Sequence, residues 1–151
     1  MQNMLKTKMQ GSKVSQAELV RRLEEAGANI AAAADGFEQW ALDDVVAASQ
    51  KIDNEKIEAK KRIRDVFRLV HDIKGQGTTF GYPSVTEIAD ILCNFMREGK
   101  VTMSSKQIQV IKLHLGAIRL VLDQKLKGES DAAKNLVKKL SVTAAAVPPL
   151  R

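Results

Sequence analysis

Apolar residues recur along most of this chain at intervals of three and four, which is the spacing of one face of an α-helix. No run alternates apolar and polar residues between turn residues, as a half-buried strand does. The pattern therefore predicts an all-α protein. Because the connections between its amphipathic segments are short, we expect an antiparallel up-and-down four-helix bundle with additional N- and C-terminal helices.

The pattern also divides the chain. We expect a flexible basic arm at 1–14, a single helical domain at 15–143 and a frayed tail at 144–151. The core of the bundle spans about 37–127, with helices at 37–51, 55–82, 85–98 and 105–127. Accessory helices at about 15–34 and 131–142 would cap the bundle or pair two chains. Asp35-Gly36 marks either an interruption or a bend between the first helix and the second.

Capping and breaking residues set several of these boundaries. Ser15 and Glu18 match a capping box at the start of the first helix. Pro83 ends the central helix, because proline cannot donate to the helical ladder. Ser84 and Glu87 then match a second capping box, and Ser104 or Ser105 begins the helix after that.

The central helix carries the most informative stretch, V-F-R-L-V-H-D-I-K-G-Q-G-T-T-F-G at 66–81. Its inward stripe is made by Val66, Val70, Ile73 and Phe80. His71 follows Val70, and one residue turns an α-helix by about 100°, so the imidazole points away from the stripe towards solvent. Gly75 and Gly77 each cost about 1 kcal/mol relative to alanine inside a helix. Such a cost indicates that another body approaches closely, and Gly75 lies one turn beyond the imidazole.

The spacing of His71, Lys74, Gly75 and Gly81 is H-x-x-K-G-x-x-x-x-x-G, with the large apolar Phe80 before the last glycine. This resembles the signature of histidine-containing phosphotransfer (Hpt) domains. The resemblance implies that His71 is a phosphoacceptor, that Lys74 screens the phosphoryl group, and that Gly75 leaves room for a receiver domain.

Partner contacts follow from the same resemblance. We expect Arg64 or Arg68 to steer the acidic receiver domain. Phe67 either supplies an apolar contact beside the ring or forms a flank of the core, and the second reading is slightly favoured. Thr78 either donates to a phosphate oxygen or caps local backbone.

The implied function is a histidine phosphotransfer protein in a bacterial two-component phosphorelay. His71 would exchange a phosphoryl group reversibly with the aspartate of a receiver domain, and a histidine kinase is a further partner. The sequence has no nucleotide-binding loop, so the chain is a phosphocarrier and not an enzyme with its own ATP site. We expect no cofactor or metal in this chain, and Mg²⁺ belongs to the receiver.

Two other functions stay open. One is an Hpt-like module that docks a receiver or kinase without being phosphorylated. The weaker one is a basic helical nucleic-acid binder, because the formal net charge is +6, but few aromatic residues are available for stacking. The other histidine, His114, lacks a following lysine–glycine pair and is expected to be a packing or interface residue.

Composition places the protein in a compartment. The single cysteine, Cys93, excludes a disulfide within the chain and fits a reducing cytoplasm. No apolar run approaches the ~20 residues that span a bilayer, and the N-terminus does not resemble a signal peptide, so we expect no membrane association. The alanine-rich stretch 26–34 is either a homodimer seam or a contact within one chain.

Overall fold

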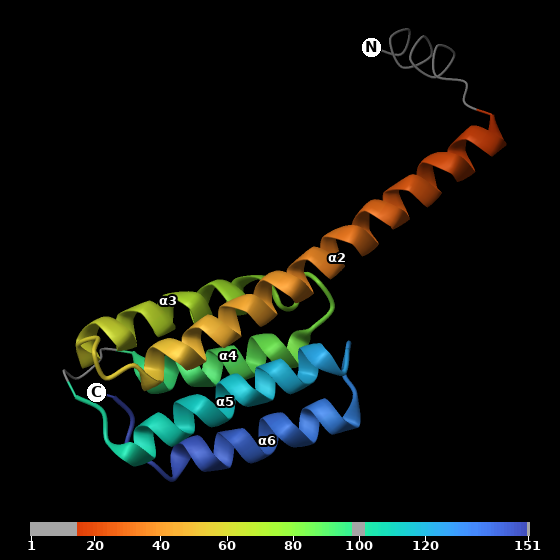
Figure 1. Cartoon of the computed structure of the whole chain (residues 1–151). Coiled ribbons are helices and arrows are strands. Elements are labelled where there is room, and N and C mark those ends of the chain that lie inside the picture. The colour runs from red at the N-terminus through yellow and green to blue at the C-terminus, as the bar shows by residue number, and fades with distance from the viewer. Residues whose placement is uncertain (1–14, 98–101, 151) are drawn as a thin grey trace, which may run out of the picture. The chain divides into compact units, whose positions relative to one another are not determined.

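The computed structural model describes residues 15–97 and 102–150, and all regular structure in these two ranges is helical (Figure 1). The helices are α2 (Gln16–Asp53), α3 (Ala59–Gln76), α4 (Pro83–Met96), α5 (Ser105–Asp123) and α6 (Asp131–Ala145). The predicted all-α class is therefore confirmed for this part of the chain. The predicted basic arm, residues 1–14, lies outside the described residues.

The chain divides into two compact units, residues 1–35 and 36–151, and the boundary falls within α2. In the described part of the first unit, Ser15 Oγ accepts a hydrogen bond from the amide of Glu18 (3.2 Å), which is one of the two bonds of the predicted capping box; the Glu18 carboxylate accepts from Arg22. The described part of this unit also exposes its large apolar side chains, which are Leu19, Val20, Leu23 and Ile30. Helical structure continues through Asp35 and Gly36, so α2 is not interrupted there.

The second unit holds the hydrophobic core. The part of α2 from Phe37 onward contributes a stripe at 37, 41, 45, 48 and 52, and α3 contributes Ile63, Val66, Val70 and Ile73. α4 contacts α3, α5 and α6, and these helices lie side by side (Figure 1). Each apolar face is removed from water by its neighbours, which stabilises the fold by roughly 25 cal/mol per Å² of apolar surface buried.

α3 ends at Gln76, six residues before the predicted end at 82, because the chain turns between Gly77 and Gly81. Gly81 has a φ of +90°, a backbone conformation that glycine adopts without steric cost. A Cβ on Gly77 would lie 3.1 Å from both the Thr86 amide nitrogen and the Tyr82 carbonyl oxygen. The absence of a side chain at Gly77 therefore allows α3 to pack closely on α4.

α4 begins at Pro83 with Tyr82 as its N-cap residue, so the predicted Ser84–Glu87 capping box is wrong. Proline is suited to the first helical position, because its fixed φ is already helical and its missing N–H would have no partner there. The next helix starts as predicted: Ser104 and Gln107 form a complete capping box for α5.

The connection from α5 to α6 folds back onto the turn after α3. The amide of Gly128 donates to the Gly81 carbonyl (2.8 Å). The buried carboxylate of Glu38 lies 3.4 Å from Lys125 Nζ and 3.7 Å from Lys127 Nζ. α5 ends at Asp123, before the predicted 127, and the residues that follow tie this end of the bundle together.

The predicted frayed tail is wrong as far as Leu150. The Leu150 side chain is fully buried, and its amide donates to the Phe95 carbonyl (2.9 Å). Gln107 Nε2 donates to the Pro148 carbonyl (2.9 Å). The tail is ordered because it supplies a donor to one of the last carbonyls of α4, which have no partner within their own helix.

Candidate functional site

His71 lies on the solvent side of α3. The helix is anchored on its other side by Val70 and Ile73, which are both fully buried. Among the described residues, no hydrogen bond or ion pair holds the imidazole; its ring contact is with Phe67, at 6.0 Å between centroids and 28° between planes. Phe67 also packs against the hydrophobic core, so it is both a flank of the core and a neighbour of the ring. The imidazole is accessible on a rigid scaffold.

Lys74, one turn beyond His71, does not project freely. Its Nζ lies 2.8 Å from Asp90 Oδ1 on α4, and 31% of the lysine side chain is exposed. Lys74 is therefore partly buried and already paired within this chain. The sequence does not reveal this ion pair, because it joins two helices whose relative position depends on the turn at 77–81.

The end of α3 is held by a threonine that the sequence analysis did not single out. Thr86 Oγ1 accepts hydrogen bonds from the Thr78 amide (2.8 Å) and the Thr78 hydroxyl (3.1 Å), and it donates to the Lys74 carbonyl (3.3 Å). The Thr78 hydroxyl therefore donates to another side chain and not to local backbone, and its role towards a phosphate oxygen stays a prediction.

Gly75 is the open position beside the imidazole. It is exposed, and a Cβ built on it would meet no atom within 4 Å. Nothing among the residues that the structure describes therefore requires glycine here, in contrast with Gly77. The absence of an internal reason agrees with a glycine that leaves space for a second molecule.

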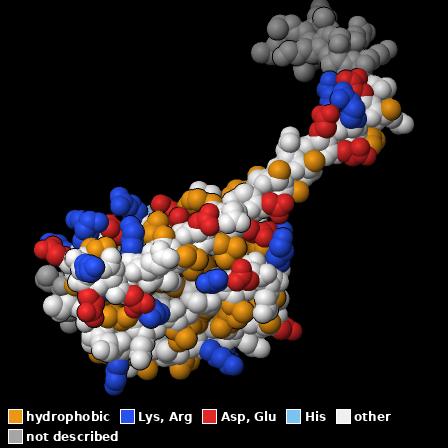
Figure 2. Space-filling view, in the orientation of Figure 1, with side chains coloured by type: hydrophobic (Ala, Val, Ile, Leu, Met, Phe, Trp, Pro, Cys, Tyr) orange, Lys and Arg blue, Asp and Glu red, His pale blue; other side chains and the backbone are white. Residues whose placement is uncertain are grey.

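Basic side chains gather over the N-terminal part of α3 (Figure 2). Some of this charge is compensated: buried Asp65 accepts a hydrogen bond from Lys61 (2.7 Å), and Arg68 lies 3.6 Å from its other oxygen. The Lys61 hydrogen bond, with the charges of Lys51 and Arg68, lowers the pKa of Asp65. Arg64 is exposed and has no ion pair within the described part of the chain.

The surface next to His71 also carries negative charge. Burial, together with the charges of Asp72 and Asp43, raises the pKa of Asp44 on α2. Asp72 directly follows His71 in the sequence, so the site combines a cation at Lys74 with acidic groups towards α2. Sequence reasoning about α3 emphasised its cations and passed over these carboxylates.

The other histidine is unlike the first. His114 is fully buried on α5, and its Nδ1–H donates to the Val110 carbonyl (2.8 Å). Burial lowers its pKa, and the hydrogen bond to Val110 partly opposes that shift. Of the two expectations for His114, a packing residue or an interface residue, its full burial within the bundle supports the first.

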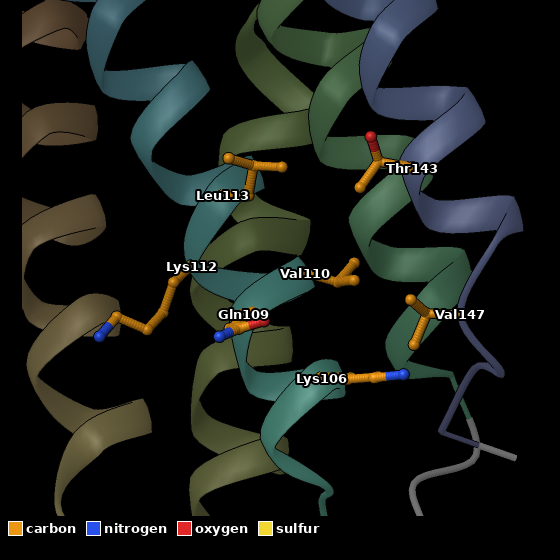
Figure 3. Close-up of a pocket in the computed structure, with 7 residues that line it drawn as sticks. All are labelled: Lys106, Gln109, Val110, Lys112, Leu113, Thr143 and Val147. Atoms are coloured by element: carbon orange, nitrogen blue, oxygen red, sulfur yellow. The ribbon is translucent and has the colours of Figure 1, made fainter.

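A groove of about 750 Å³ lies elsewhere, between α5 and α6 (Figure 3). Leu113, Val110 and Val147 form its apolar wall, and Lys106 lies near one end. None of its lining residues belongs to α3 or α4, so it is separate from the His71 surface. Within the described residues, no group of three or more histidine, cysteine or acidic side chains is arranged to hold a metal ion. None of the described helices is long and apolar enough to cross a membrane.

The fold and the site together define a class, an α-helical bundle that presents one accessible histidine with a lysine a turn away. Comparison with protein families places the chain within that class: residues 15–121 match the Hpt domain family. The match covers more than half of the chain, and the protein belongs to the Hpt domain family. Comparison with curated proteins gave no match, and neither did comparison with solved structures.

Proposed function

We propose that this protein is a phosphocarrier in which His71 exchanges a phosphoryl group with the aspartate of a response-regulator receiver domain. The observation that supports this most directly is the exposed His71 ring, free of hydrogen bonds among the described residues, on a helix that is firmly packed behind it. A nucleophile that must meet a partner's active site has to stand on an open surface and not in a pocket.

The transfer needs only what the imidazole and the partner supply. The lone pair of an unprotonated ring nitrogen attacks phosphorus, the N–P bond forms, and the bond between phosphorus and the aspartate oxygen breaks. The aspartate leaves as a carboxylate, and the hydrogen on the other ring nitrogen takes no part. Lys74 lies one helical turn away and would balance the negative charge added to the ring. Mg²⁺ would act in the receiver.

Docking uses the surface around His71. Gly75 leaves room for the partner, Phe67 offers an apolar contact, and Arg64 and Arg68 attract an acidic domain. Because the chain belongs to the Hpt domain family, the proposal includes an antiparallel up-and-down order of the four core helices. It also includes a bacterial protein that acts in the cytoplasm. A histidine kinase is the alternative phosphoryl donor or acceptor.

The experiment is a transfer assay. Receiver domains of the source organism, phosphorylated with acetyl phosphate, are mixed with the wild-type chain and with His71→Gln. We expect an acid-labile label on the wild type and none on the variant, although the variant retains His114. Labelling of His71→Gln would overturn the assignment, and binding of a receiver with no label on either chain would favour the docking module.

A further inference from the structure

Lys74 is held at both ends by α4. Its backbone carbonyl accepts a hydrogen bond from Thr86 Oγ1 (3.3 Å), and its ammonium lies 2.8 Å from Asp90 Oδ1. Thr86 and Asp90 are four residues apart and so share one face of α4. Asp90 provides the only ion pair of Lys74 within the residues that the structure describes.

We infer that Asp90 is a positioning residue that limits how strongly Lys74 stabilises a phosphoryl group on His71. This inference rests on the proposed function. Before transfer, Asp90 neutralises the ammonium and fixes its direction. After transfer, a group with roughly two negative charges competes with Asp90 for the same ammonium.

Asp90 therefore makes phospho-His71 less stable. Asp90 takes part of the hydrogen-bonding capacity of Lys74 and adds a negative charge of its own near the site. Both effects raise the free energy of phospho-His71 relative to the free histidine, and so favour onward transfer to a receiver. Since 31% of Lys74 and 48% of Asp90 are exposed, the lysine can change partners without disturbing the core.

The size of the effect follows from the exposure of the pair. Ion pairs between exposed side chains are screened by water, and their measured strengths correspond to roughly two- to five-fold changes in an equilibrium constant. We therefore expect Asp90→Asn, which keeps the size of the side chain and removes its charge, to shift the phosphoryl equilibrium towards phospho-His71 by about two- to five-fold.

The test measures that equilibrium constant between the full chain and a receiver domain phosphorylated with acetyl phosphate. Asp90→Asn should raise it, and Asp90→Glu should restore a value near that of the wild type. In a Lys74→Ala background, Asp90→Asn should have a smaller effect, because the lysine through which it acts is gone. The matched control is Asp53→Asn, which breaks the 2.8 Å pair with Lys112, of similar exposure, and makes the same change in net charge.

The outcomes separate the two ideas. Normal labelling with an unchanged equilibrium constant in Asp90→Asn would overturn the inference alone. An equal shift in the Lys74→Ala background, or in Asp53→Asn, would also overturn it, because the effect would then be one of general charge. Absence of label on the wild type would overturn both the inference and the proposed function.

Discussion

Gly75 lies in the last turn of α3 and Gly77 is the C-cap residue of that helix, and the two glycines have different roles. A Cβ on Gly77 would collide with the start of α4, whereas one on Gly75 would meet no atom of the described residues within 4 Å. Both glycines look alike in the sequence, where each is an unfavourable residue within a helical pattern. The distinction depends on how α3 and α4 meet, which local spacing does not contain.

This contrast gives a paired prediction. Gly75→Leu should leave the free energy of unfolding unchanged or raise it by up to about 1 kcal/mol, since the backbone is helical and the position is open. It should nevertheless abolish receiver binding by bulk. Gly77→Ala should lower the free energy of unfolding by about 1–3 kcal/mol through overpacking. Urea unfolding measures the free energy of unfolding of both variants, and a titration with the receiver measures binding. Normal receiver binding by Gly75→Leu would contradict the assignment of an open docking surface around Gly75.

Lys74 can be tested apart from the fold. We predict that Lys74→Ala slows transfer to His71 by about 10- to 100-fold, the range for loss of a hydrogen bond to a charged group. The lost pair with Asp90 should cost at most about 1 kcal/mol of stability, because the pair is partly exposed. Rapid-quench transfer assays and thermal melts distinguish these effects. A transfer rate equal to that of the wild type would show that Lys74 does not face the phosphoryl group.

His114 makes stability depend on pH. Its pKa is lowered in the folded state by burial, so the unfolded chain binds the proton more readily. The contribution of His114 to the free energy of unfolding is therefore fully present above the ordinary histidine pKa of about 6.5. As the pH decreases from about 6.5 towards the pKa of the folded state, the free energy of unfolding decreases by up to about 1.4 kcal/mol per pH unit.

The measurement is urea unfolding at several values between pH 7.5 and 5.5. His71→Gln, which removes the exposed histidine, should follow the wild-type curve. His114→Leu should flatten it over the same range. A wild-type stability that does not change as the pH falls would contradict the buried, uncharged state of His114.

At the level of whole elements, each helix of the described chain lies where the apolar periodicity predicted helical structure, although α2 joins the two segments predicted at about 15–34 and 37–51. Val66, Val70 and Ile73 face inward as predicted, and the accessibility of His71 follows from their phase. The helix ends were predicted less well. α3 stops at Gln76 and α4 starts on Pro83 because Gly77 packs on Thr86, and contacts between helices are not visible in the spacing within one helix.

The tail gives an element-scale prediction. Leu150→Ala should lower the free energy of unfolding by about 2–4 kcal/mol, because a fully buried leucine leaves a cavity. Pro149→Ala, at the exposed neighbouring position, is the matched control and should change it by about 0.5 kcal/mol or less. Urea unfolding of both variants decides the matter, and equal stabilities would mean that the tail does not contribute to the core.

At the scale of the whole molecule, the core is built from residues of the second unit. The hydrophobic cluster begins at Phe37, and the described apolar side chains of the first unit are largely exposed. The predicted core of 37–127 is therefore too short at its C-terminal end, where Leu140 and Leu150 belong to the cluster.

We predict that removal of residues 1–34 leaves the remaining bundle folded, with a melting temperature within a few degrees of the full chain, because the hydrophobic cluster begins at Phe37. A loss of about 1 kcal/mol would correspond to about 2–4 °C in a chain of this size. The fluorescence of Trp40, which packs against the core, follows unfolding in both chains. Loss of cooperative unfolding in the shortened chain would show that the first unit is required for the fold.

The central claim is that the exposed histidine, and not the buried one, carries the phosphoryl group. With only two histidines in the chain, ¹⁵N labelling of histidine gives an NMR spectrum of two imidazole rings. On addition of a phosphorylated receiver, the account predicts that the ring nitrogens of His71 shift as an N–P bond forms and that those of His114 do not. A receiver that loses its phosphoryl group only to water, with both rings unchanged, would contradict it.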